Sequence, residues 1–226
     1  MLNSNITQNP LEQEERITLN LLGVIEENSA ITQRSLAAEL GVALGLTNTY
    51  MKRCAKKGLI KVKQIPSNRY TYYLTPNGFA EKSRLTSEYL KQSFNFFRLA
   101  RSQSDDLLHH CIKSGWTRVA LTGKSDLTEI IILSATEINI KITGIIDAKA
   151  ATTTSTYMNL PVVSKLSKLK TLHALIVTDM EKPQETFNEA VKFFPQDKIL
   201  TVPILGVNRE RTNQSAVAAL NAEYPG

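Results

Sequence analysis

The hydrophobic positions in the first part of the chain follow a helical period three times. Apolar residues recur on one face from Leu11 to Ile25, again from Leu36 to Leu40, and again from Leu46 to Cys54. Gly41 and Gly58 stand where the second and third patterns end, as glycine often does after a helix. The pattern predicts three helices, the last two joined by a tight turn.

The hydrophobic pattern changes to alternation after Gly58. Apolar residues alternate through 59–65, a turn is indicated at 66–68, and residues 70–74 return as a second strand. Two helices joined by a tight turn and followed by a hairpin form the outline of a winged helix-turn-helix. We expect this unit to occupy residues 1–76.

The charge distribution of this unit indicates what kind of partner it binds. Between Gly41 and Ala80 there are seven basic residues and no acidic ones, whereas acids resume at Glu39 and Glu81. The basic residues are Lys52, Arg53, Lys56, Lys57, Lys61, Lys63 and Arg69. The whole chain has a formal net charge of +6. A basic surface of this kind predicts a polyanionic partner, here double-stranded DNA.

Four segments carry a resemblance to a known family, namely QRSLAAELG, LGLTN, KKGLIKV and YYLTPNGFAEKSRLT. Over roughly the first hundred residues the chain resembles the MarR-type winged helix-turn-helix transcriptional regulators, especially the subgroup associated with bacterial exopolysaccharide gene clusters. The resemblance implies a dimeric, sequence-specific DNA-binding transcriptional regulator. One position departs from it, because Ala43 stands where such regulators usually place a serine that caps the recognition helix.

The third helix would enter the major groove, where Asn binds adenine and Arg binds guanine. We predict exposed base contacts from Thr47, Asn48 and Arg53. The predicted phosphate contacts are Arg34, with Gln33 beside it, and Lys52, Lys56 and Lys63; Asn68 and Arg69 at the wing tip would reach the minor groove. The alternatives are a solvated basic helix face and a wing arginine without a partner.

A long apolar pattern begins after Thr75-Pro76, a favourable helix start. Its apolar surface is wide enough to need a partner. One strip carries Leu85, Tyr89, Phe96 and Ala100, and beside it lie Leu90, Phe94, Phe97 and Arg101. We expect linking and dimerisation helices over 77–114 and a homodimer; the alternative is packing on the C-terminal part of the same chain. A break is predicted near residues 102–104, with Ser104 capping a second short helix.

From Trp116 onward strongly apolar segments alternate with amphipathic ones, as in RVALTG, IKITGIID and ALIVTD. This alternation predicts a parallel sheet covered on both faces by helices. Residues 115–226 are therefore expected to form a small Rossmann-like domain of four or five strands. The predicted fold class is an α+β winged helix-turn-helix followed by a small α/β parallel-sheet domain.

Ligands of such sheets bind beyond the carboxyl ends of the strands. The residues at these positions are Thr122, Gly123, Lys124, Ser125, Asp147, Thr178 and Asp179, and they form the predicted ligand-binding set. The complete G-x-G-x-x-G pattern is absent, because Gly123 is its one representative. Three interpretations stay open: a nucleotide or nucleotide-sugar effector, another small metabolite, or a domain that serves only packing.

The sequence offers no recognisable catalytic constellation. His109, His110 and Cys111 are adjacent on a predicted helix and point in different directions, which disfavours a metal site. Cys54 could act as a redox switch, although a buried thiol is the simpler reading. We expect no enzyme, no metal and no certain cofactor; the alternative is a nucleotide-sugar enzyme with an accessory winged domain. No apolar run approaches the roughly 18 residues of a membrane span, so a cytoplasmic location is predicted.

Overall fold

The computed structural model describes residues 10–66, 69–138, 140–147, 155–169 and 171–210. The chain divides into two compact units, with the boundary between Asn95 and Phe96. The first unit contains helices followed by a two-stranded sheet, and the second contains a six-stranded sheet. The predicted fold class, a winged helix-turn-helix followed by an α/β parallel-sheet domain, is confirmed.

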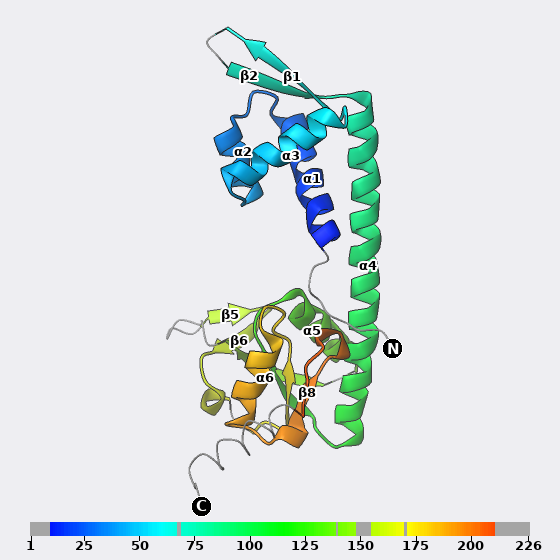
Figure 1. Ribbon diagram of the computed structural model, residues 1–226. Helices are drawn as coiled ribbons and strands as arrows, with labels where there is room; N and C mark the ends of the chain where they lie inside the picture. The colour runs from blue at the N-terminus through cyan, green and yellow to red at the C-terminus, as the bar shows by residue number, and fades with distance from the viewer. Residues whose placement is uncertain (1–9, 67–68, 139, 148–154, 170, 211–226) are drawn as a thin grey trace, which may run out of the picture. The chain divides into compact units, whose positions relative to one another are not determined.

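The first unit has the predicted order of elements (Figure 1). These are α1 (Pro10–Glu27), α2 (Gln33–Leu40), α3 (Leu44–Lys56), β1 (Ile60–Ile65) and β2 (Arg69–Leu74). The two strands pair antiparallel, with Ile60 opposite Leu74. The hairpin therefore follows the helix-turn-helix directly in the chain and forms its wing.

Local chemistry explains where the helices of this unit begin and end. The Thr32 hydroxyl accepts a hydrogen bond from the Ser35 amide and caps the start of α2. Gly41 ends that helix in the left-handed region at φ 64°, where a side chain would be strained. The three helices and the hairpin enclose one apolar core, formed by Ile17, Leu21, Leu22, Ile25, Ile31, Leu36, Tyr50, Met51, Cys54, Leu59, Ile60 and Tyr72.

Helix α4 (Pro76–Lys113) is one continuous helix of 38 residues. It begins as predicted, because the Thr75 hydroxyl accepts a hydrogen bond from the Gly78 amide. The predicted break near residues 102–104 is wrong. Ser104 is buried within the helix, and its hydroxyl donates to the Ala100 carbonyl 2.7 Å away instead of capping a new helix. A serine fits within a helix when its hydroxyl donates to a carbonyl of the preceding turn, as it does here.

The sheet of the second unit has the order β5-β6-β4-β3-β7-β8. Its strands are β3 (Arg118–Thr122), β4 (Lys141–Ile146), β5 (Ser155–Tyr157), β6 (Leu160–Val163), β7 (Ala174–Val177) and β8 (Ile199–Thr201). All neighbours pair in parallel except β5 and β6. Without β5, the order corresponds to 3-2-1-4-5, that of the first five strands of a doubly wound sheet.

The predicted number of four or five strands is wrong, because the described residues alone form six strands in this sheet. The extra strand, β5, turns into β6 through Met158 and Asn159, which both have positive φ angles of 49° and 62°. Two positive φ values favour a tight hairpin turn, which usually contains glycine. Because no glycine marks this turn, the sequence pattern does not predict it.

Helices α5 (Asp126–Ile138) and α6 (Pro183–Val191) cover the sheet (Figure 1). They connect β3 to β4 and β7 to β8, and these crossovers run in opposite directions from the centre of the sheet. Right-handed crossovers then place α5 and α6 on opposite faces. The described residues of the unit also include three short 3₁₀ helices, at Leu166–Lys168, Gln196–Lys198 and Pro203–Leu205.

The second unit has its own apolar core, which is centred on the sheet. The strand residues Val119, Ala120, Leu121, Ala174 and Ile176 are fully buried. The C-terminal part of α4 contributes to the same core. Across the parts of the chain that the structure describes, no helix is both long and apolar enough to cross a membrane.

Candidate nucleic-acid interface and strand-end site

Helix α3 has two distinct faces. Thr47, Tyr50, Met51 and Cys54 are buried, with the spacing of a helical stripe. The opposite face carries the exposed side chains of Lys52, Arg53 and Lys56. The helix therefore presents cations to solvent while its apolar stripe fixes it to the core.

Thr47 does not occupy the exposed position that was predicted for it. Its side chain is fully buried, at 0% exposure, and its hydroxyl donates to the Ala43 carbonyl 3.3 Å away. The reason is periodicity, because 47, 50, 51 and 54 follow the i, i+3, i+4, i+7 pattern of a buried stripe. Leu46 differs in the opposite direction, because the sequence pattern predicts it in the apolar stripe, whereas its side chain is 43% exposed.

The start of α3 lacks a side-chain cap. Ala43 is the N-cap residue, and its side chain forms no capping hydrogen bond. The amides of the first turn therefore have fewer protein acceptors than those of α2, where Thr32 caps. Such amides at a helix N-terminus suit an anionic partner.

Arg53 is held by residues of the first unit. Its Nη1 donates to the Glu14 Oε1 atom 2.9 Å away, and its guanidinium carbon lies 5.8 Å from the centre of the Tyr50 ring. Its side chain is still 53% exposed. The predicted base-reading arginine is thus accessible, and it is also oriented by an acid on α1.

The other predicted DNA-contacting residues lie on three elements. Gln33 and Arg34 are exposed in the first turn of α2, where the Gln33 amide donates to the Tyr72 hydroxyl at 3.4 Å. Lys63 is exposed on β1, and Asn48 is half-buried on α3. Arg69 pairs through its backbone with Ile65, and Asn68 lies outside the described residues.

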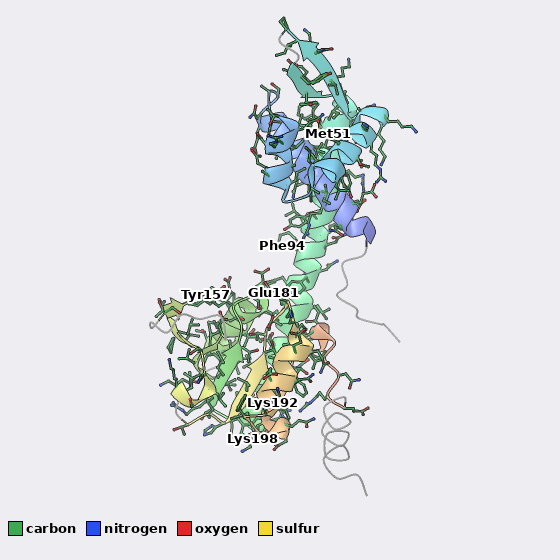
Figure 2. The ribbon with its side chains drawn as sticks, turned by 60° about the vertical axis from the view of Figure 1, so that its left-hand side comes forward. Met51, Phe94, Tyr157, Glu181, Lys192 and Lys198 are labelled. Carbon is green, nitrogen blue, oxygen red and sulfur yellow. The ribbon has the colours of Figure 1, made fainter. Side chains whose placement is uncertain are left out.

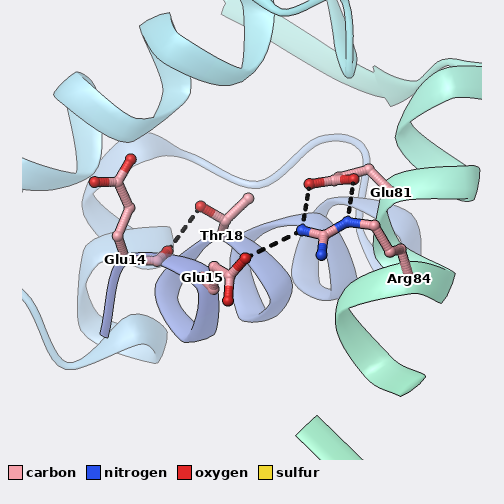
Figure 3. A network of polar contacts seen from close by, with 5 residues as sticks. All are labelled: Glu14, Glu15, Thr18, Glu81 and Arg84. Atoms are coloured by element: carbon pink, nitrogen blue, oxygen red, sulfur yellow. Dashed lines mark hydrogen bonds and ion pairs between the residues drawn. The ribbon is translucent and has the colours of Figure 1, made fainter. Parts of the chain in front are cut away.

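A charged network fixes α1 to α4 (Figure 3). Arg84 donates to Glu81 from Nε at 2.9 Å and to Glu15 from Nη2 at 3.2 Å. The hydrogen bond from Arg84 lowers the pKa of the Glu81 carboxyl, and the same bond raises the pKa of Arg84. Lys82 forms a further ion pair with Glu26. The acids of α1 therefore face cations on two other helices.

Cys54 lies on the buried stripe of α3. Burial raises the pKa of its thiol to about 11, with a smaller opposing effect from Lys57. A thiol with a high pKa and little exposure is a poor nucleophile at neutral pH. The structure therefore gives no support to the redox switch that the sequence left open.

An apolar stripe on α4 stays exposed. Leu90, Phe94 and Phe97 follow i, i+4, i+7 spacing, and the Phe94 side chain is 57% exposed (Figure 2). Tyr89 beside them is also exposed. Phe96, in contrast, packs against the core of the second unit. Within the described residues, the stripe of Leu90, Phe94 and Phe97 is thus available to a partner.

The fold gathers the predicted ligand-binding residues at one edge of the second sheet. Strands β4, β3 and β7 are neighbours and run parallel, so Asp147, Gly123 and Thr178 follow their carboxyl ends side by side. Lys124 and Asp147 form an ion pair at 3.3 Å, and the Asp147 side chain is only 11% exposed. The structure therefore brings these residues to one edge of the sheet, and ligand binding by them stays a prediction.

Most hydroxyls at this edge bond to other groups of the edge itself. The Ser125 hydroxyl donates to the Thr178 carbonyl at 2.7 Å, and the Thr128 hydroxyl lies 2.8 Å from the Thr178 hydroxyl. The Thr178 hydroxyl donates in turn to the Thr122 carbonyl at 2.5 Å. These bonds join the loop after β3 to the loop after β7.

The close approach of these two loops requires Gly123. It has φ 79°, and a Cβ atom there would lie 3.2 Å from both Cα and Cβ of Asp179. The Asp179 carboxylate accepts hydrogen bonds from the amides of Glu181 and Lys182 and from the Thr186 hydroxyl. Over the residues described, no group of three His, Cys, Asp or Glu side chains is placed to hold a metal ion.

A family model described as winged helix-turn-helix DNA-binding matches residues 14–61. The match runs from α1 into β1 and includes the helix that carries the exposed cations. The chain therefore has a winged helix-turn-helix DNA-binding domain in its N-terminal unit. The predicted exopolysaccharide subgroup and the Rossmann-like ligand domain stay predictions.

Among solved structures, the chain is similar to a mutant of S. aureus MepR bound to an oligodeoxyribonucleotide. The identity is 21%, the match covers 38% of this chain and 61% of that one, and the TM-score is 0.31. This chain thus spans less than two thirds of that structure's length.

Two further solved structures show comparable likeness. A second mutant of S. aureus MepR is 17% identical, with 43% of this chain and 77% of that chain covered and a TM-score of 0.33. Streptococcus pneumoniae FabT in complex with DNA is 20% identical, with 54% and 69% covered and a TM-score of 0.29. Among curated proteins, no match to the chain was found.

Proposed function

We propose that this chain is a dimeric, sequence-specific DNA-binding transcriptional regulator that acts in the cytoplasm. One observation carries the proposal: α3 of a winged helix-turn-helix domain exposes Lys52, Arg53 and Lys56 in an interval without acidic residues. An α-helix fits the major groove of B-DNA, and cations on its face neutralise phosphates. A row of exposed cations of this kind has no role in packing a protein core.

The roles of individual residues follow from exposure. Lys52, Lys56, Lys63 and Arg34 are exposed and suit phosphate contacts, with Gln33 beside Arg34. Arg53 suits a base edge, and exposed Leu46 suits a thymine methyl group. Asn48 stays in the proposed set, but its Oδ1 atom is buried, so a bidentate contact with adenine would require its side chain to turn outward. Asn68 and Arg69 at the wing tip remain the proposed minor-groove contacts. Thr47 leaves the set, because a fully buried side chain cannot reach a base.

The proposed dimer forms through α4, the connecting element of the proposed region 77–114. Leu90, Phe94 and Phe97 form an exposed apolar stripe with the spacing of a helix–helix seam. A two-fold pair of chains would present two α3 helices to the half-sites of a pseudo-palindrome. Burial of the stripe in the pair would explain why three large side chains at this spacing are exposed in one chain.

The second part of the proposal is that the Rossmann-like unit, residues 115–226, senses a nucleotide or nucleotide-sugar. Support comes from the strand order and from the gathering of Lys124, Asp147 and the loop of Gly123 at the carboxyl edge. A ligand there would compete with the Lys124–Asp147 ion pair for one of its two members. Linkage then requires that DNA binding change ligand affinity by the same factor.

The test is selection of duplexes from a random DNA pool by the full chain, followed by binding measurements over a salt series. The proposal predicts an enriched sequence whose affinity falls steeply with salt, with a slope of about −0.9 per phosphate contacted. Addition of nucleotides and nucleotide-sugars should shift that affinity for one compound class. Failure to enrich any sequence would remove the regulator interpretation, and indifference to every compound would remove the sensing part alone.

A further inference from the structure

The contact between Arg53 and Glu14 bears on how the proposed interface reads sequence. Arg53 lies on α3 and Glu14 on α1, and the two side chains are 53% and 39% exposed. This is the ion pair that joins α3 to another helix of the described first unit. We propose that Glu14 is a positioning residue that orients Arg53 for a guanine. The inference rests on the proposed DNA-binding function.

The geometry leaves one edge of the guanidinium available. Arg53 uses Nη1 for Glu14, and Nε and Nη2 form no hydrogen bond with any residue that the structure describes. Arginine has five N–H donors in a rigid plane, so the edge of Nε and Nη2 keeps two parallel donors. Guanine presents O6 and N7 as two adjacent acceptors in the major groove. One edge of Arg53 thus holds Glu14 while the other matches guanine.

The Tyr50 ring further restricts the orientation of the Arg53 guanidinium plane. The Arg53 guanidinium carbon is 5.8 Å from the centre of the Tyr50 ring, and Tyr50 is itself buried in the core of the unit. A cation near an aromatic face gains a modest attraction. With Tyr50 near the guanidinium and Glu14 at one edge, the arginine loses less rotamer freedom on binding. Such preorganisation favours affinity and selectivity without a new contact.

Glu14 is placed firmly enough to act in this way. It lies in α1, where its carbonyl accepts a hydrogen bond from the Thr18 hydroxyl at 2.8 Å (Figure 3). Its neighbour Glu15 binds Arg84, and Glu26 near the other end of α1 binds Lys82. These ion pairs tie α1 to α4, so the carboxylate that faces Arg53 projects from a fixed helix.

The charge of Glu14 also separates two roles on α3. Because Glu14 compensates the charge of Arg53, the pair contributes little to the attraction for phosphates. Lys52 and Lys56 have no ion pair among the described residues and supply that attraction. Affinity for any DNA should therefore depend on the lysines, and discrimination among sequences should depend on the Glu14–Arg53 pair.

The test compares Glu14→Gln and Glu14→Ala with the wild-type full chain on a selected duplex and on a random duplex over a salt series. We expect the ratio of the two affinities to fall about tenfold for Glu14→Ala, within the range of one bidentate base contact. The salt slope on random DNA should steepen by about 0.9, because the released Arg53 can pair with a phosphate. Glu27→Gln, which removes an exposed acid of α1 that forms no ion pair among the described residues, should change neither quantity.

A double-mutant cycle separates positioning from a general loss of structure. In an Arg53→Ala background, Glu14→Ala should have no further effect on the affinity ratio, because the positioned group is gone. An unchanged ratio and slope in Glu14→Ala, or an equal effect in the Arg53→Ala background, would overturn the inference. A wild-type chain that prefers no sequence would instead overturn the proposed function beneath it.

Discussion

Helix α3 and the strand-end edge of the second unit both carry clusters of polar side chains where proteins of their fold bind ligands. The polar side chains of the two regions have different partners. On α3, Lys52 and Lys56 are exposed and have no ion-pair partner among the described residues. At the strand-end edge, Ser125, Thr128 and Thr178 bond to one another. The first arrangement keeps its polar groups for a partner, whereas the second uses them to join its own loops.

The comparison shows that the position of residues in a fold is a weaker guide to function than whether their polar side chains are already bonded to one another. Both regions occupy the expected sites, the recognition helix and the carboxyl edge of a parallel sheet. At the strand ends, a ligand can bind to Lys124 or Asp147 without breaking the buried hydroxyl network. Any sensing by the second unit is therefore expected to act through that ion pair.

The strongest expected effect is loss of DNA affinity in the double variant Lys52→Ala and Lys56→Ala. Removal of two phosphate contacts should reduce the magnitude of the salt slope by about 1.8 and weaken binding to every sequence. Lys192→Ala with Lys198→Ala, on the second unit (Figure 2), removes the same charge and serves as the control. Equal losses in both pairs would mean that net charge, and not α3, governs binding.

The next effect concerns the stability of the strand-end edge. Thr128→Val removes the hydroxyl that donates to the Gly123 carbonyl and lies 2.8 Å from the Thr178 hydroxyl, so the half-buried Gly123 carbonyl loses this hydrogen bond. We expect a loss of about 1–3 kcal/mol in the free energy of unfolding, measured by urea denaturation of the full chain. Thr136→Val changes an exposed hydroxyl of α5 and should cost far less. Equal costs would argue that the network has no special role.

Dimer formation through α4 should depend on the apolar stripe. Phe94→Ala is expected to raise the dimer dissociation constant about tenfold or more, since a buried aromatic side chain contributes roughly 1.5–3 kcal/mol. Sedimentation equilibrium over a concentration series measures this. Phe193→Ala is the matched control, because Phe193 is highly exposed but lies outside α4. A wild-type chain that stays monomeric at all concentrations would contradict the proposed dimer.

A smaller effect is expected in thiol chemistry. Cys54 should react with a disulfide reagent at pH 8 at least about tenfold more slowly in the folded chain than in urea, because burial raises the pKa of its thiol to about 11. A Cys111→Ser variant isolates the signal of Cys54. Rapid reaction in the folded state, coupled to loss of DNA binding, would restore the redox-switch interpretation.

The smallest effect concerns Glu81. Its pKa is lowered by the hydrogen bond from Arg84, so its contribution to stability is present above the usual pKa of an unfolded glutamate, about 4.3. That contribution is lost as the pH falls through the lower pKa of the folded state. Glu81→Gln should therefore cost below about 0.5 kcal/mol at pH 7 after solvent screening, and this cost should shrink as the pH falls through the lowered pKa. A cost that stays constant as the pH falls would assign the effect to packing.

Periodicity predicted most of the architecture. The apolar stripes gave the helices, and the turn signals at Gly41 and Gly58 placed their ends close to those observed. The strand β5 was missed because its turn uses Met158 and Asn159 in place of glycine. Ser104 was misread as a cap because a serine bonded to the preceding turn has no signal in the sequence.

The candidate interface was predictable in location but less so in detail. The acid-free interval located α3, and the same spacing that buries Tyr50 and Cys54 could have shown that Thr47 is buried. The Glu14–Arg53 pair was beyond reach, because its residues are 39 positions apart and on different helices. At the strand ends, residue types indicated which residues share the edge, but the hydrogen bonds among their hydroxyls depend on the folded positions of loops that are far apart in the sequence.

The most direct test of the central claim is lysine acetylation of the full chain with and without its selected duplex, read by mass spectrometry. Lys52, Lys56, Lys63, Lys141, Lys168 and Lys192 are all exposed in the free chain and can report. We predict that DNA protects Lys52, Lys56 and Lys63, while Lys141, Lys168 and Lys192 keep their reactivity. Protection of the second group without the first would contradict the assignment of α3 and the wing as the DNA-binding surface.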